Sequence, residues 1–207
     1  MKLAAQIISF IFHPLLLPTW LVALLCYFFP PLLMIRQESV WLVIGFIFVF
    51  TFVLPIVNLV VFKVMGTIQS FHLTTRKERI IPFAMIAIFY GMVSYLFYTK
   101  LQMGSSFNKV ILIIFLLVLT SLLLTFFYKV SVHSLAMWGG VGILLPLNKV
   151  TVEPVLLLPV IAVIILSGLV TSARLALDAH TPRETLVGSI AGFAVGFFGM
   201  LVLFRFV

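Results

Sequence analysis

The chain has 207 residues, of which 64% are hydrophobic and 9% are charged, and its mean hydropathy is +1.33. A soluble domain carries about 25% charged residues, so this composition excludes a soluble globular protein and predicts a multi-pass membrane protein. The net charge of +8 does not indicate a nucleic-acid partner, because the basic residues lie singly or in one short loop between hydrophobic segments, where membrane topology and lipid phosphates explain them.

The first apolar segment, about residues 3–33, is interrupted by His13-Pro14 and by three further prolines. We therefore expect it to be kinked or irregular rather than one straight helix. Lys2 precedes it as in a signal peptide, but no convincing small-residue cleavage site follows, and we interpret the segment as a retained first helix. Cys26 is the single cysteine, which excludes an intrachain disulfide.

Further apolar segments lie at about residues 40–62, 82–98, 110–127, between Ser134 and Leu147, and at about 154–171 and 185–206. Their lengths are near the roughly 20 residues that cross about 30 Å of hydrocarbon as a helix. Pro55 is expected to kink the first of them. We predict an all-α fold, a polytopic transmembrane helical bundle of about six to seven spans, which forms a single membrane domain over residues 1–207.

A polar segment, Ser172 to Phe193, separates the last two apolar segments. It holds several ionisable residues: Arg174, Asp178, His180, Arg183 and Glu184. Charged side chains beside hydrocarbon are costly, so such a cluster indicates a functional site. A structural alternative is that Thr181 to Glu184 is a capping box that begins the last helix and that Arg174 and Asp178 pair on a helix surface. This alternative leaves His180 unexplained.

Two other polar segments precede it. Lys129 to Ser134 interrupts an apolar run, and Lys129 and His133 are four residues apart, hence on one helical face; the alternative is that His133 is a hydrogen-bonded packing residue. The polar connection at residues 63–81 ends in a basic cluster, Arg76 to Arg79. Arginine suits phosphate, although a solvated basic loop explains the cluster equally well.

The order of these segments favours a shared site. If seven spans each cross once, the connections after the second, fourth and sixth spans lie on the same side of the membrane. They carry Arg76–Arg79, Lys129–His133 and Arg174–Glu184. A phosphate-binding site at one membrane face requires this arrangement.

The spacing Arg174-x5-His180-x3-Glu184 resembles the third signature of the type 2 phosphatidic acid phosphatase superfamily, S-R-x5-H-x3-D. The resemblance implies that His180 attacks phosphorus, that Glu184 orients it, and that Arg174 holds phosphate oxygens. Ser131 and His133 are in register with the second signature, P-S-G-H. By that resemblance His133 protonates the leaving oxygen and Ser131 binds phosphate.

The resemblance covers about residues 76–193 and implies further phosphate contacts. The first signature, K-x6-R-P, is similar to the basic cluster before Pro82, with Arg76, Lys77 and Arg79, and Lys129 would add positive charge. The implied activity is a metal-independent lipid phosphatase or diphosphatase with a phosphohistidine intermediate and no cofactor. Its substrate would be a lipid phosphate or an isoprenoid (di)phosphate. The alternative is a non-catalytic or transport-type membrane protein that binds lipid phosphates.

Charge counts bear on orientation in the cytoplasmic (inner) membrane. Eight of the Lys and Arg residues lie on the side of the site: Lys2, Lys63, Arg76, Lys77, Arg79, Lys129, Arg174 and Arg183. Taken literally, the positive-inside rule then places the site in the cytoplasm. Five of these eight are assigned to phosphate binding, and without them three residues stand against the five on the opposite side: Arg36, Lys100, Lys109, Lys149 and Arg205. This count, and the family resemblance, favour a site on the outer face.

Overall fold

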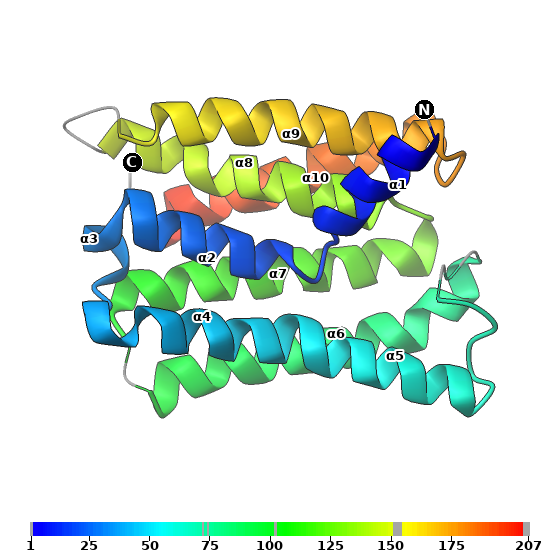
Figure 1. Ribbon diagram of the computed structural model, residues 1–207, viewed down its shortest axis with the longest axis horizontal. Coiled ribbons are helices and arrows are strands. Elements are labelled where there is room, and N and C mark those ends of the chain that lie inside the picture. The colour runs from blue at the N-terminus through cyan, green and yellow to red at the C-terminus, as the bar shows by residue number, and fades with distance from the viewer. Residues whose placement is uncertain (1, 72, 74, 102, 151–154, 205–207) are drawn as a thin grey trace.

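The computed structural model describes residues 2–71, 73, 75–101, 103–150 and 155–204. Arg205, counted above on the side opposite the site, lies outside these residues. The described chain contains helices and no strands, and the helices lie side by side along the long axis of the molecule (Figure 1). The predicted all-α helical bundle is confirmed.

The helices are, in chain order, α1 (Lys2–Ile11), α2 (Leu17–Phe28), α3 (Pro30–Leu33), η1 (Gln37–Ser39), α4 (Val40–Phe48), η2 (Val49–Val53), α5 (Leu54–Val64), α6 (Arg76–Thr99), α7 (Ser105–Phe127), α8 (Val132–Val150), α9 (Leu157–Ala176) and α10 (Pro182–Phe204). Within the described residues, five helices are long and apolar enough to cross a membrane: Gln37–Val64, α6, α7, α9 and α10. They are compatible with a multi-pass membrane protein. The helices α1, α2 and α8 are apolar but shorter.

The chain reverses direction at successive connections along the bundle. The connections between α5 and α6, between α7 and α8, and between α9 and α10 lie at the same end, together with the N-terminus (Figure 1). This is the arrangement that the order of the polar segments required. The helices α1 and α2 follow one another from that end toward the opposite one (Figure 1).

Proline explains the irregular N-terminal segment, as predicted. Helix α1 ends at Ile11 and α2 begins at Leu17, so His13-Pro14 lies in the break between them. Pro18 lies in the first turn of α2, where a missing N–H leaves no helical hydrogen bond unmade. Pro30 begins α3 in the same way.

The span that contains Pro55 has one wide turn, the π-helical η2, immediately before the proline. Proline cannot donate to the carbonyl four residues earlier and clashes with it in a regular helix, and a π turn relieves this conflict. The Thr51 carbonyl instead accepts a hydrogen bond of 3.3 Å from the Tyr90 hydroxyl. The disturbance predicted at Pro55 is therefore present, and it also ties this span to α6.

Helices α8 and α10 pack with their backbones in close approach. Gly188, Gly192 and Gly196 recur every four residues on α10, and small residues at this spacing allow two membrane helices to meet closely. A Cβ atom on Gly192 would overlap the backbone carbonyl of Leu135, and one on Gly188 would lie 2.6 Å from the Ser131 oxygen. This packing holds the first turns of α8 and α10 together.

Two local expectations and one structural alternative were wrong. Helix α6 begins at Arg76, six residues earlier than expected, because Thr75 and Glu78 form a capping box, so the basic cluster is helical and not in a loop. Residues 128–131 are not helical, so Lys129 does not share a helical face with His133. Helix α9 ends at Ala176, and Asp178 has a left-handed backbone (φ 52°), a conformation that ends helices and leaves no Arg174–Asp178 ion pair among the described residues.

Candidate functional site

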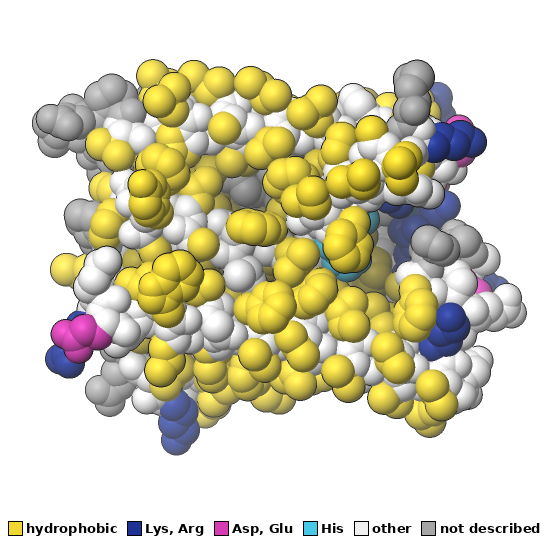
Figure 2. Space-filling view, in the orientation of Figure 1, with side chains coloured by type: hydrophobic (Ala, Val, Ile, Leu, Met, Phe, Trp, Pro, Cys, Tyr) yellow, Lys and Arg dark blue, Asp and Glu magenta, His cyan; other side chains and the backbone are white. Residues whose placement is uncertain are grey.

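A cavity of about 160 Å³ receives polar side chains from elements far apart in the sequence. Its basic lining residues are His13, Arg79, His133, Arg174 and His180. They come from the α1–α2 break, α6, the first turn of α8, the last turn of α9, and the α9–α10 connection. Figure 2 shows histidine side chains recessed among apolar ones, beside the end where Lys and Arg side chains gather.

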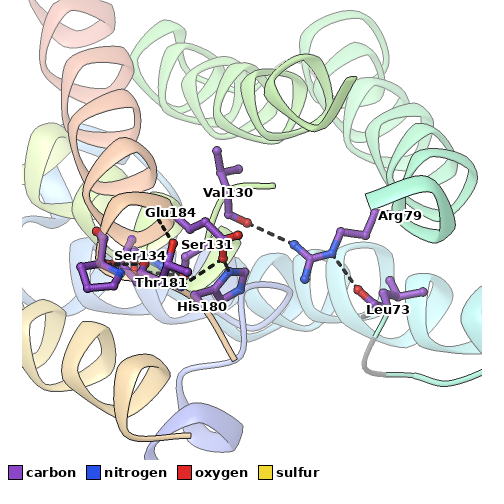
Figure 3. Close-up of polar contacts among 10 residues, drawn as sticks. Leu73, Arg79, Val130, Ser131, Ser134, His180, Thr181 and Glu184 are labelled. Carbon is purple, nitrogen blue, oxygen red and sulfur yellow. Dashed lines mark hydrogen bonds and ion pairs between the residues drawn. The ribbon is translucent and has the colours of Figure 1, made fainter. Parts of the chain in front are cut away.

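His180 and Glu184 form the only contact between a basic and an acidic side chain within ion-pair distance among the described residues. Nδ1 of His180 lies 2.8 Å from Oε2 of Glu184, across the start of α10 (Figure 3). The same Oε2 accepts the Thr181 N–H at 3.2 Å, while the Glu184 N–H donates to the Thr181 hydroxyl at 3.3 Å. The capping box and the His180 contact therefore coexist, and one carboxylate serves both.

The contact fixes the protonation of His180. A carboxylate only accepts hydrogen bonds, so Nδ1 carries the proton and Nε2 of the neutral ring keeps its lone pair. Burial, together with the positive charges of Arg79 and Arg174, lowers the pKa of His180 from 6.5 to about 4, although the Glu184 hydrogen bond opposes this shift. At neutral pH the ring is therefore an uncharged base or nucleophile.

Arg79 is 6% exposed and is held by backbone carbonyls. Its Nε donates to the Leu73 carbonyl at 2.8 Å, and one terminal nitrogen donates to the Val130 carbonyl at 3.1 Å. Figure 3 shows the side chain reaching from α6 toward His180 and Glu184. A guanidinium has five N–H donors, so the other terminal nitrogen stays available to a bound anion.

Arg174 is the second positively charged side chain that lines the cavity. Its Nε is buried and has no hydrogen-bond partner in the described part of the chain. Neither Arg79 nor Arg174 has a carboxylate within ion-pair distance among those residues. Buried charges are normally paired, because removal from water is costly, so this cavity favours a bound anion.

His133 is oriented by the N-terminal helix. Its Nε2 lies 3.2 Å from the Ser9 carbonyl of α1, and a carbonyl only accepts, so Nε2 carries the proton and Nδ1 keeps the lone pair. When Nδ1 gains a proton, the Ser9 carbonyl continues to stabilise the charged ring. That arrangement suits a group that takes up and releases a proton.

The structure does not bring every predicted phosphate ligand to the cavity. Arg76 donates to the Phe126 carbonyl at the end of α7, at 2.7 Å, and Lys77 is exposed. The Ser131 hydroxyl accepts the Ser134 N–H at 3.3 Å, so it caps α8. None of these three residues lines the cavity, and neither does Lys129. Among the predicted site residues, the cavity is lined by His180, His133, Arg174 and Arg79, with Glu184 bonded to His180.

The sequence interpretation missed two contributors from the N-terminal segment, Ser9 and His13. His13 lines the cavity, and the Ser9 carbonyl orients His133. The available signal for His13 was an ionisable residue within an apolar segment, which indicates function in a membrane protein. The role of the Ser9 carbonyl could not be predicted, because every residue has a backbone carbonyl whatever its side chain.

A second, apolar cavity of about 340 Å³ adjoins the first. It lies between α2, α7 and α8, and Pro14, Tyr90, Leu117, Val118 and Ala136 line both cavities. The polar cavity thus continues into a space lined by aliphatic and aromatic side chains. Among the described residues, no group of three or more His, Cys, Asp or Glu side chains could hold a metal ion.

Comparison of the chain with protein-family models, with curated proteins and with solved structures finds no match.

Proposed function

We propose that this protein is an integral-membrane lipid phosphatase or diphosphatase, which hydrolyses a phosphate ester or anhydride through a phosphohistidine. One observation carries the proposal. Two guanidinium groups, of the buried Arg79 and the partly buried Arg174, have no carboxylate partner among the described residues and share a cavity with an imidazole whose Nδ1 proton is held by Glu184. This arrangement supports phosphate binding next to a neutral nucleophile.

In the first step, Nε2 of His180 attacks phosphorus and the bond from phosphorus to the leaving oxygen breaks. Glu184 stabilises the positive charge that develops on the ring, and Arg79 and Arg174 stabilise the charge on the phosphoryl oxygens. His133, protonated at Nδ1 when the substrate anion enters, gives that proton to the leaving oxygen.

In the second step, His133 accepts a proton from water. The water oxygen bonds to phosphorus as the bond from Nε2 of His180 breaks, which releases inorganic phosphate and restores both rings. The covalent intermediate divides the hydrolysis into two displacements, and the two imidazoles keep separate roles because different partners, Glu184 and the Ser9 carbonyl, fix their protons.

The apolar cavity supports a substrate with a hydrophobic tail. It joins the polar cavity through shared lining residues, so a phosphate group beside His180 can continue into a chain that runs between α2, α7 and α8. Burial of each CH₂ group contributes about 0.8 kcal/mol. An acyl or isoprenoid phosphate therefore fits this pair of cavities better than a small soluble phosphate does.

The proposed location is the cytoplasmic membrane, with the cavity at the outer face. Its support is the charge count that excludes the proposed phosphate ligands. Single cysteines at Arg183 and at Lys100, in a Cys26→Ser background, test the orientation with a membrane-impermeant thiol reagent. Labelling from outside is expected at position 183, and labelling at position 100 alone would reverse the orientation.

Phosphate release tests the activity. Detergent-solubilised protein is given phosphatidic acid or an isoprenyl diphosphate in the presence of a metal chelator, and we expect inorganic phosphate together with an acid-labile phosphoenzyme. His180→Asn should abolish both, whereas Arg183→Gln, which changes an exposed residue, should leave both intact. Tight binding of these lipids without release would instead support the non-catalytic or transport-type alternative.

A further inference from the structure

His13 is the cavity residue whose role neither the sequence signatures nor the two chemical steps explain. His13 lies in the break between α1 and α2, and its side chain lines the polar cavity. The next residue, Pro14, lines both cavities. His13 therefore lies where the polar cavity meets the apolar one.

Local hydrogen bonding fixes the tautomer of His13. The Leu15 N–H donates to Nδ1 at 3.3 Å, so Nδ1 is unprotonated and Nε2 carries the proton of the neutral ring. Nε2 has no hydrogen-bond partner in the described part of the chain. The ring thus offers a free N–H donor to the cavity that it lines.

The neighbouring ring of His133 offers an acceptor instead of a donor. Its Nε2–H donates to the Ser9 carbonyl, and its Nδ1 keeps a lone pair. The two rings meet edge to face, with centroids 5.6 Å apart and planes at 81°. His133 can therefore exchange a proton at Nδ1. His13 can donate a hydrogen bond from Nε2 but does not exchange a proton, since protonation of its Nδ1 would break the contact with the Leu15 N–H.

We propose that His13 binds the substrate by donating its Nε2 proton to a phosphoryl oxygen at the boundary with the hydrophobic tail. This role rests on the proposed function and adds a ligand from the N-terminal segment to Arg79 and Arg174. A neutral donor at this position strengthens binding of the phosphoryl group without a further buried charge. His13 positions the substrate, and no covalent step passes through it.

Two amide substitutions separate the nitrogens of His13. In His13→Gln, the side-chain NH₂ can replace Nε2 but nothing accepts the Leu15 N–H; in His13→Asn, the carbonyl oxygen can replace Nδ1 but the donor is lost. Each variant is assayed for KM and kcat with phosphatidic acid, and for binding of vanadate by its effect on thermal unfolding. A hydrogen bond to a charged group contributes enough for a change of roughly 10- to 100-fold.

We expect His13→Asn to weaken vanadate binding and raise KM by roughly 10- to 100-fold, and His13→Gln to stay close to wild type. The reverse order would show that the Leu15 contact matters and would overturn the proposal. Equal effects in both variants, or no folded protein from either, would overturn it as well. Absence of hydrolysis by the wild type would contradict the proposed function alone, because the vanadate comparison still tests His13.

Discussion

Nδ1 of His180 lies 2.8 Å from Oε2 of Glu184, and the same oxygen accepts the Thr181 N–H at 3.2 Å. The first turn of α10 therefore orients the imidazole with the carboxylate that also caps the helix. Because the two residues lie on either side of the helix start, their spacing of four residues follows from the geometry of the cap.

Substitutions of Glu184 and Thr181 distinguish the contact of Glu184 with His180 from the capping of α10. Glu184→Gln keeps an oxygen for the Thr181 N–H but removes the charge that stabilises a positive His180, so phosphate release should fall by roughly 10²–10⁴-fold with a small change in thermal stability. Thr181→Ala removes the hydroxyl that accepts the Glu184 N–H and should cost about 1 kcal/mol in unfolding free energy. Similar rate losses in both variants, in proportion to lost stability, would argue against a chemical role for Glu184.

Titration of His180 should make the free energy of unfolding depend on pH. Burial, with the charges of Arg79 and Arg174, lowers the pKa of His180 from 6.5 to about 4, so between these values the unfolded chain binds a proton that the folded chain does not. The unfolding free energy should therefore decrease as pH falls from about 6.5 to about 4, by up to about 1.4 kcal/mol per pH unit from this group. Thermal unfolding in detergent measures it. His180→Asn should flatten the profile, and an unchanged slope would contradict the assigned shift.

The two arginines that line the cavity should matter more than an exposed one nearby. Arg79→Gln and Arg174→Gln each remove a charge that lines the cavity and should lower kcat/KM for phosphatidic acid by roughly 10²–10³-fold. Arg183→Gln alters an exposed residue and is the matched control. Comparable losses in all three variants would indicate a general effect of positive charge on binding to the lipid surface.

The close packing of α8 and α10 should not tolerate a methyl group. A Cβ at Gly192 meets the backbone of Leu135, whereas one at Gly168 on α9 meets nothing within 4 Å. Gly192→Ala should destabilise the protein by about 1–3 kcal/mol and lower activity by separating the first turns of the two helices. Gly168→Ala should be neutral or slightly stabilising, because alanine favours helices. Thermal unfolding and phosphate release on both variants test this expectation.

Filling the apolar cavity should discriminate between substrates by chain length. Gly140 lines that cavity, and a Cβ there meets nothing within 4 Å, so Gly140→Leu should occupy space needed by a lipid tail. We expect a rise of KM for a long-chain phosphate and little change for a short-chain one. Gly45 also has open space around its Cβ but lies outside the cavity, and Gly45→Leu is the control. Equal inhibition with both chain lengths would place the tail elsewhere.

The sequence by itself determined the class of fold and the end of the bundle where the candidate site lies. Apolar segments of membrane-spanning length specify helices because lipid offers no partner for backbone N–H and C=O groups. The order of the polar segments then placed them at one end. His180 and Glu184 were also readable, because a capping box and a histidine four residues before its glutamate are local features.

Tertiary structure decided which side chains reach the cavity. Successive residues of a helix point about 100° apart, so the start of α6 at Arg76 turns Arg79 inward and leaves Lys77 exposed. The contribution of α1, through His13 and the Ser9 carbonyl, depends on packing between helices far apart in the sequence. Local patterns specify where a helix starts and how apolar it is, whereas its rotation and its neighbours are set by packing such as the contact of Gly192 with Leu135.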